Sequence, residues 1–330
     1  MLYNKRHVEY EQKSNHDVNH WVRVTNPFKL PMNVIAYFQD KLLRSPRERK
    51  PLIVLANLAA LLNTMITYDD KHDYQGIRTA GLTLKDEKGH CIEQNTVLYA
   101  IAASLLPQHR SAFSWIIAKN PHGYVCKPMK EVGVHPFLSF RYQGVEYIAD
   151  VVKGEVKKFD PVGFAITTER LTYREFIAWA LLYGGEDVGL VHHDPKSALN
   201  WMGAAHFIDP KNYTIDLLAA QMLDKLKRWN DAERVYRRAI QIAPRALETH
   251  SEYADFLASY RIVANSPSRD NEARKEYETA LSFETQDVQF LSELEQSLVE
   301  FESRDLARKA RRKCEDLLRT PHFKKYFAHF

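Results

Sequence analysis

The sequence predicts an α+β domain followed by an all-α domain built from helical repeats. Three short segments rich in aromatic and β-branched residues lie within residues 111–152 and are typical of antiparallel strands. From Leu171 onward the apolar residues have helical spacing, and small residues recur at a period of 34. A chain of 330 residues that is 45% hydrophobic is long enough to bury a core in each domain.

The composition argues against several classes of protein. With 46 Lys and Arg against 42 Asp and Glu, the net charge of +4 is too small to require a nucleic acid or a membrane as partner, and neither is expected. Asparagines interrupt the longest apolar stretch, 51–67, which is shorter than the roughly 20 residues of a membrane span. Three cysteines form neither a disulfide framework nor a zinc motif, so we expect a cytoplasmic protein without metal or cofactor.

The first part of the chain alternates polar segments with helical patterns. Residues 1–48 are expected to form an arm and a helix, the helix over 31–44. A second helix is expected over 51–67, where Pro51 suits the first helical turn. A third helix begins at Cys91 and ends before Pro107, which cannot continue it.

The strand segments that follow predict a β-hairpin. They are "SAFSWIIA" at 111–118, "HPFLSFRYQ" at 135–143 and "VEYIADVV" at 145–152. The second and third are separated by Gln143 and Gly144, a pair suited to a tight turn. An antiparallel sheet is therefore expected in this region.

The hairpin would bring two polar residues together. If Tyr142 pairs with Val145, then Asp150 lies diagonally opposite His135 on the same face of the sheet. Diagonal neighbours have Cα atoms roughly 7–8 Å apart, within reach of an imidazole and a carboxylate. A turn one residue longer would place Asp150 on the other face. Because a buried aspartate needs a partner, His135 is the natural candidate.

Cys91 has the position of a reactive thiol. The first turn of a helix presents unpaired amides and the positive end of the helix dipole, and both favour the thiolate. Nucleophilic catalysis also requires a base and a group that orients it, which His135 and Asp150 would supply. The Cys91 backbone amide is a candidate oxyanion donor. Further candidates for that role, without ranking, are Tyr74, Gln75 and Gln94.

The residues of this constellation resemble a known family. The segments "GHC" at 89–91, "HPF" at 135–137 and "YIAD" at 147–150 are similar to the transglutaminase-like superfamily of papain-related thiol enzymes. The resemblance implies a papain-like core over 49–168 and acyl transfer through a thioester, as in a protease, an amidase or a transglutaminase. Two alternatives stay open: a catalytically inactive scaffold, and an acyltransferase that forms amides.

The second domain contains a repeated pattern of small and large residues. Ala198, Met202, Ala205 and Pro210 match Ala232, Tyr236, Ala239 and Pro244 at an offset of 34, and Ala273, Tyr277 and Ala280 repeat the internal spacing. The preceding helices supply Ala220 and Ala254. The pattern resembles the tetratricopeptide repeat (TPR), which implies stacked helix pairs over 169–320 and a short tail, 321–330. Such repeats would capture a protein or peptide.

Three other features carry weaker functional hypotheses. Cys314 occupies a repeat position that requires a small residue, and Cys126 lies in a loop, so neither is expected to be reactive. The "HHD" at 192–194 has the residue types of a metal site, but adjacent side chains rarely converge on one ion. No metal ligand is therefore assigned.

Overall fold

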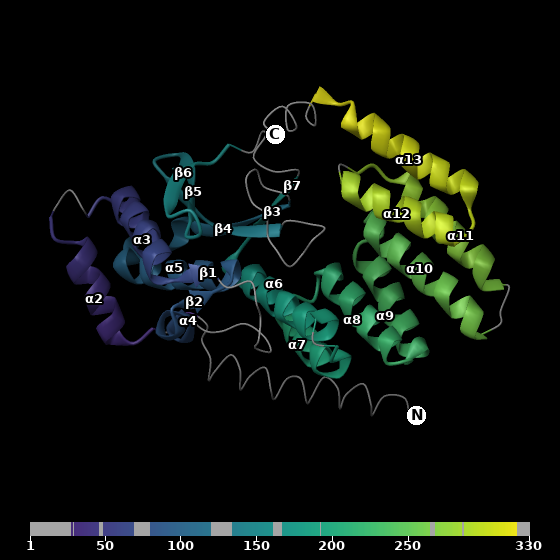
Figure 1. Ribbon diagram of the computed structural model, residues 1–330, viewed down its shortest axis with the longest axis horizontal. Helices are drawn as coiled ribbons and strands as arrows, with labels where there is room; N and C mark the ends of the chain where they lie inside the picture. Colours follow the sequence, from purple (N-terminus) through teal and green to yellow (C-terminus); the bar gives the residue numbers. More distant parts are fainter. Residues whose placement is uncertain are drawn as a thin grey trace. The chain divides into compact units, whose positions relative to one another are not determined.

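The chain divides into two compact units, Met1–Ala180 and Leu181–Phe330 (Figure 1). Most of the described chain is helical, and a small antiparallel sheet lies in the first unit. Within the described ranges, no helix is both long enough and apolar enough to cross a bilayer. The computed structural model describes residues 28, 30–45, 49–68, 80–119, 134–160, 167–191, 193–264, 268–285 and 287–321.

The predicted helices of the first unit are present. The helix expected over 31–44 is α2 (Met32–Leu42), and that expected over 51–67 is α3 (Pro51–Met65), which begins at its proline. The helix that starts at Cys91 is α5 (Cys91–Leu105), and its first eight residues are all buried. A short helix, α4 (Ala80–Asp86), precedes it in a stretch for which no helix was predicted from the sequence.

The antiparallel sheet has five strands in the order β6-β5-β4-β3-β7. The three inner strands are those predicted, whereas the two edge strands are short and polar and lack the apolar alternation that marks a strand. A separate parallel pair, β1 (Thr67–Tyr68) and β2 (Lys88–Gly89), precedes α5. The strands of the sheet are β3 (Phe113–Lys119), β4 (Val134–Tyr142), β5 (Val145–Asp150), β6 (Glu155–Lys158) and β7 (Thr167–Leu171).

The predicted hairpin register is confirmed. Tyr142 pairs with Val145, and Leu138 pairs with Ala149. Gln143 and Gly144 both have positive φ, 51° and 76°, as a two-residue turn between twisted strands requires. His135, on β4, and Asp150, at the end of β5, therefore share one face of the sheet.

The turn between β5 and β6 is held by α3. Gly154 has a φ of +63°, and a Cβ atom at this position would lie 3.1 Å from the Asn63 Cβ and 3.3 Å from the Ala60 Cα. The Asn63 side chain donates a hydrogen bond of 2.7 Å to the Val152 carbonyl. Glycine is required here for both its backbone conformation and its size. The helix thus fixes the turn that follows Asp150.

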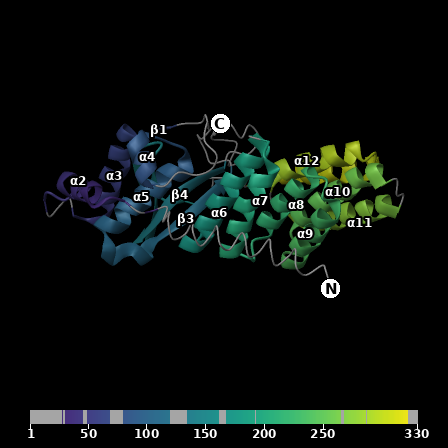
Figure 2. The ribbon, with the colours of Figure 1, turned by 90° about the horizontal axis from the view of Figure 1, so that it is seen from below.

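The second unit is a series of antiparallel helices that lie side by side (Figure 2). Helix α6 (Tyr173–Glu186) contains the boundary between the units. It starts with a capping box, in which Thr172 and Glu175 bond each other's backbone N–H groups. The helices that follow pack mainly as the pairs α8–α9, α10–α11 and α12–α13. They are α7 (Pro195–Ile208), α8 (Tyr213–Lys225), α9 (Trp229–Ile242), α10 (Leu247–Ala264), α11 (Ser268–Ser282), α12 (Val288–Glu300) and α13 (Arg304–Leu318).

The repeat pattern predicted from the sequence forms the core of this unit. Its small and large positions are all buried, and the structure bears out a TPR-like arrangement of helix pairs. The alanines let paired helices approach closely, and the larger side chains fill the space between pairs. These residues are Ala198, Met202, Ala205, Ala220, Ala232, Tyr236, Ala239, Ala254, Ala273, Tyr277 and Ala280.

Candidate functional site

The start of α5 is held by contacts before and after Cys91. Gly89 pairs with Tyr68 of β1, and a Cβ on Gly89 would lie 2.7 Å from the Thr83 Cγ2, so glycine permits a close approach to α4. His90 is the N-cap of α5: its backbone N–H donates to the Glu93 carboxylate at 3.0 Å, and its Nδ1 accepts from the Ile92 N–H at 3.5 Å. This capping box fixes the first helical turn.

His90 was not among the residues singled out from the sequence, yet its ring contacts the thiol. The Cys91 Sγ lies 3.4 Å from the His90 Nδ1 and 3.6 Å from its Nε2. Because the sulfur is almost equally far from both ring nitrogens, it does not lie in the direction in which either nitrogen makes a hydrogen bond. Because Nδ1 also accepts from the backbone, His90 is placed to cap the helix rather than to take the thiol proton in line. The spacing of His90 and Glu93 was the available sequence signal.

The structure brings His135 and Asp150 together. The His135 Nε2 lies 3.8 Å from the Asp150 Oδ1, and both side chains are 1% exposed. This distance is longer than a hydrogen bond but short enough for an ion pair. The two groups therefore form a buried ion pair when the imidazole is protonated. The prediction that they share a face is thereby confirmed.

Few hydrogen bonds offset the burial of the Asp150 carboxylate. Its Oδ1 accepts from the Lys153 backbone N–H at 3.3 Å, and its Oδ2 has no hydrogen-bond partner in the described parts of the chain. Burial raises the pKa of Asp150 to about 6, although the Lys153 amide and ammonium group act in the opposite direction. A buried carboxylate with raised pKa beside a histidine is a typical feature of functional sites.

Asn95 connects the turn that carries Cys91 to the strand that carries His135. Its Nδ2 donates to the Cys91 carbonyl at 2.8 Å and to the Pro136 carbonyl at 2.9 Å. Its Oδ1 accepts from the Leu138 N–H at 3.0 Å. This residue was not singled out from the sequence, although a polar side chain four positions after Cys91 in an apolar helix lies on the same helical face.

The remaining sequence candidates either make other contacts or lie outside the described residues. The Gln94 Nε2 donates to the Gly89 carbonyl at 2.9 Å, so this amide braces the turn before the helix. Cys314 lies on α13, where burial raises the pKa of its thiol. Tyr74, Gln75, Cys126 and His192 lie outside the described residues.

Asp194, which follows His192 and His193, is described and has a role in helix capping. The Asp194 side chain caps α7 by accepting from the Ser197 N–H at 3.0 Å. Among the described residues, no group of three or more His, Cys, Asp or Glu side chains is arranged to hold a metal ion.

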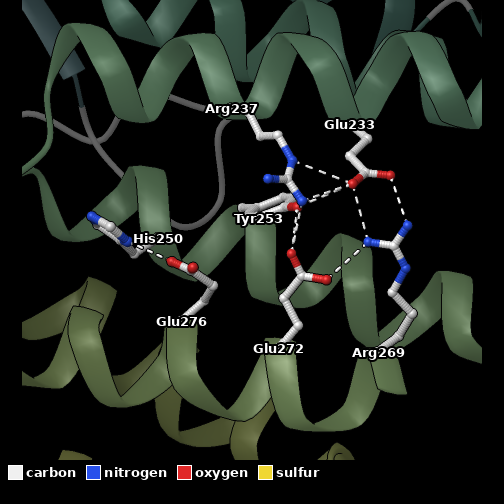
Figure 3. A network of polar contacts seen from close by, with 7 residues as sticks. All are labelled: Glu233, Arg237, His250, Tyr253, Arg269, Glu272 and Glu276. Carbon is white, nitrogen blue, oxygen red and sulfur yellow. Dashed lines mark hydrogen bonds and ion pairs between the residues drawn. The ribbon is translucent and has the colours of Figure 1, made fainter. Parts of the chain in front are cut away.

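A second polar group lies in the helical unit and joins α9 to α11 (Figure 3). Arg269 binds both carboxylate oxygens of Glu233 at 3.0 Å and also contacts Glu272 at 2.9 Å. Arg237 lies 3.0 Å from Glu233 and 2.8 Å from Glu272, and the Tyr253 hydroxyl donates to Glu272 at 3.2 Å. Each carboxylate in this group has a cationic partner, so the network stabilises the stacking of repeats.

His250 of α10 makes two polar contacts next to this network. The His250 Nδ1 lies 2.6 Å from the Glu276 Oε2 (Figure 3). Its Nε2 lies 3.0 Å from the Pro244 carbonyl oxygen. The ring thus ties α10 to α11 and to the loop before α10. Both nitrogens face acceptors, which leaves neither for catalysis.

Comparison with known proteins gives a limited result. No protein-family model and no curated protein matches the chain. A solved structure described as "MamA RS-1 ArsTM double mutant" is 13% identical, covers 43% of this chain and 75% of its own, and has a TM-score of 0.30. A second, described as "YrrB: a TPR protein with an unusual peptide-binding site", is 18% identical, covers 47% and 76%, and has a TM-score of 0.29. The assignment of repeats here depends on the spacing and helix pairing given above.

Proposed function

We propose that the first unit is a thiol-dependent acyl-transfer enzyme of the transglutaminase-like type, with Cys91 as nucleophile. In the proposed reaction the Cys91 sulfur bonds to the carbonyl carbon of an amide or ester, and the thiol proton passes to His135. His135 then gives this proton to the leaving amine or alcohol as the carbonyl–heteroatom bond breaks. Water or an amine releases the acyl group from the thioester and restores the thiol. Asp150 orients the imidazole and stabilises its protonated form.

The observation that carries this proposal is the buried pairing of His135 with Asp150. His135 lies on β4, the strand to which Asn95 attaches the first turn of α5, and that turn holds Cys91 at a helix N-terminus. Burying an aspartate with so few hydrogen bonds costs stability. A catalytic role gives a reason for that cost, since active sites are where such groups are retained.

The test is the rate at which a small alkylating agent modifies Cys91. We expect iodoacetamide to label Cys91 at pH 7 at least about tenfold faster than Cys314, and His135→Ala to remove the difference. His109→Ala, which changes a histidine outside the constellation, serves as the matched control and is expected to have no effect. Peptide mass spectrometry distinguishes the cysteines. Equal rates for Cys91 and Cys314 in the wild type would contradict the proposal.

A second measurement tests the chemistry of the acyl group. Incubation with p-nitrophenyl acetate is expected to give an initial burst of nitrophenol and an acetyl group on Cys91. The substrate class that we propose is a protein or peptide, which the helical repeats of the second unit would bind.

The alternative is a binding scaffold without catalysis. The observation that favours it is burial: the Cys91 side chain is 1% exposed, so a substrate reaches the sulfur only if covering atoms move. In that case a partner protein would be retained equally by wild type and Cys91→Ala, and p-nitrophenyl acetate would leave no acetyl group on Cys91.

A further inference from the structure

The carboxamide of Asn95 is hydrogen-bonded to two segments that are distant in sequence. The side chain is 0% exposed, and its nitrogen donates to the Cys91 and Pro136 carbonyls while its oxygen accepts from the Leu138 N–H. One nitrogen atom therefore joins the carbonyl of the proposed nucleophile to that of the residue after the proposed base, His135. Few side chains other than asparagine can supply two donors and an acceptor in so short a reach.

The strand pairing explains why a side chain is needed at this point. Strand β3 pairs with β4 from Val134 to Phe140, whereas β5 pairs with β4 from Leu138 onward. The backbone of β4 around Pro136 thus needs a partner other than β5, because buried peptide groups are almost always hydrogen-bonded. Asn95 supplies it from the helix that begins at Cys91.

The neighbouring residue shows that the helix alone does not require this arrangement. Thr96 is also buried, and its hydroxyl donates to the Ile92 carbonyl at 2.8 Å, within the same helix. Asn95 instead crosses to β4, so it sets the position of the first turn of α5 relative to that strand. Rate depends steeply on such positioning, since a displacement of about 1 Å can cost a factor of about 100.

We propose that Asn95 is a positioning residue, which holds the Cys91 thiol and the His135 imidazole in register for proton transfer. This inference rests on the proposed function. Asn95 acts through the backbones of Cys91 and β4 and does not itself touch the reacting atoms. Its loss is expected to uncouple the thiol from the imidazole while the two elements still fold.

The experiment measures Cys91 alkylation against pH in the full-length protein. For Asn95→Leu and Asn95→Asp we expect the pH 7 rate to fall at least about tenfold and His135→Ala to have no further effect in these backgrounds. The matched control is Thr96→Val, which removes a buried hydrogen bond of the same helical turn. It is expected to stay within about twofold of wild type and to keep its pH profile. Circular dichroism establishes that each variant is folded at the temperature used.

The outcomes separate this inference from the proposed function. A reactive, His135-dependent Cys91 that is unchanged by Asn95→Leu would overturn the positioning role and leave the enzyme proposal intact. A wild-type Cys91 no faster than Cys314 would overturn both. Unfolding of both Asn95 variants, with Thr96→Val folded, would assign Asn95 to stability alone and also overturn the inference.

Discussion

Each unit of the protein buries an aspartate beside a histidine, and the surroundings shift the pKa values of the two aspartates in opposite directions. In the first unit, Asp150 lies 3.8 Å from His135. In the second unit, Asp216 of α8 lies 3.3 Å from the Nδ1 of His206 on α7. Both carboxylates are 1% exposed. The two carboxylates therefore have the same residue type and burial, whereas the His135 side chain is 1% exposed and that of His206 is 31% exposed.

The difference lies in the further partners of each carboxylate. Arg238 of α9 binds both oxygens of Asp216 at 2.7 Å, so this group joins three helices. Burial alone would raise the pKa of both aspartates. For Asp216 the interactions with His206 and Arg238 outweigh burial and lower the pKa, whereas for Asp150 burial dominates and raises the pKa to about 6. A carboxylate that serves stability has its charge neutralised. Among the described residues, no arginine is hydrogen-bonded to Asp150 as Arg238 is to Asp216. We infer that Asp150 is kept in this state because the proposed function requires its interaction with His135.

The largest effect is expected on breaking the Asp216 group. Arg238→Met keeps an unbranched apolar stem but removes the guanidinium, which leaves His206 as the remaining ion-pair partner of the buried Asp216 among the described residues. We expect the free energy of unfolding of the second unit to fall by about 3 kcal/mol, since Arg238 is 38% exposed and the full range for buried pairs is about 3–5 kcal/mol. Hydrogen exchange of peptides from α8 and α9, followed by mass spectrometry, measures the change.

The matched control for this variant lies on the same helix. Arg234→Met also removes an arginine–aspartate pair, but Arg234 is 49% exposed and its partner Asp231 is 30% exposed. A change of less than about 1 kcal/mol is expected, as for surface ion pairs in general. If both variants lost the same stability, the burial of Asp216 would not be the cause.

In the first unit a smaller effect is expected, and here removal of the charged partner, Asp150, stabilises the protein at neutral pH. Because the pKa of Asp150 is raised from its ordinary value of 3.8 to about 6 on folding, the folded protein binds more protons than the unfolded chain between these values. The free energy of unfolding therefore falls as the pH rises through this window. Relative to Asp150→Asn, the wild type should lose on the order of 2 kcal/mol between pH 4 and pH 7. Hydrogen exchange of β4 and β5 peptides, corrected for the intrinsic effect of pH, reports the difference.

The same variant separates stability from reactivity. Asp150→Asn is expected to be at least as stable as the wild type at pH 7, yet its Cys91 should react with iodoacetamide more slowly because the imidazole loses its orienting charge. A variant that was both less stable and equally reactive would show that Asp150 is a structural group like Asp216.

The register of the β4–β5 hairpin was predictable from the sequence because short-range rules determine it. A two-residue turn of Gln143 and Gly144 allows one pairing of the flanking strands, and side chains alternate strictly along each strand. The meeting of His135 with Asp150 follows from these two rules. The buried alanines of the repeats were predictable for a similar reason, since their spacing repeats along the chain.

The contacts around Cys91 were less predictable because they depend on packing between distant segments. Asn95 contacts β4 more than 40 positions along the chain, and nothing local in the sequence specifies which strand a polar side chain will meet. The same holds for Asp216, whose partner Arg238 lies 22 positions away on another helix. The edge strands β6 and β7 were missed because their short polar sequences lack an apolar face.

The smallest effect is expected in the partly exposed network between α9 and α11. Glu233→Gln keeps the shape of the side chain but removes the charge that Arg269 and Arg237 share. We expect a loss of about 1 kcal/mol in the free energy of unfolding, because Glu233 is 17% exposed and Glu272 still binds both arginines. Half a molar salt should reduce this loss, since screening weakens the wild-type interactions. The more buried Asp216 group should respond less to salt, and equal salt dependence of Glu233→Gln and Arg238→Met would contradict the ranking by burial.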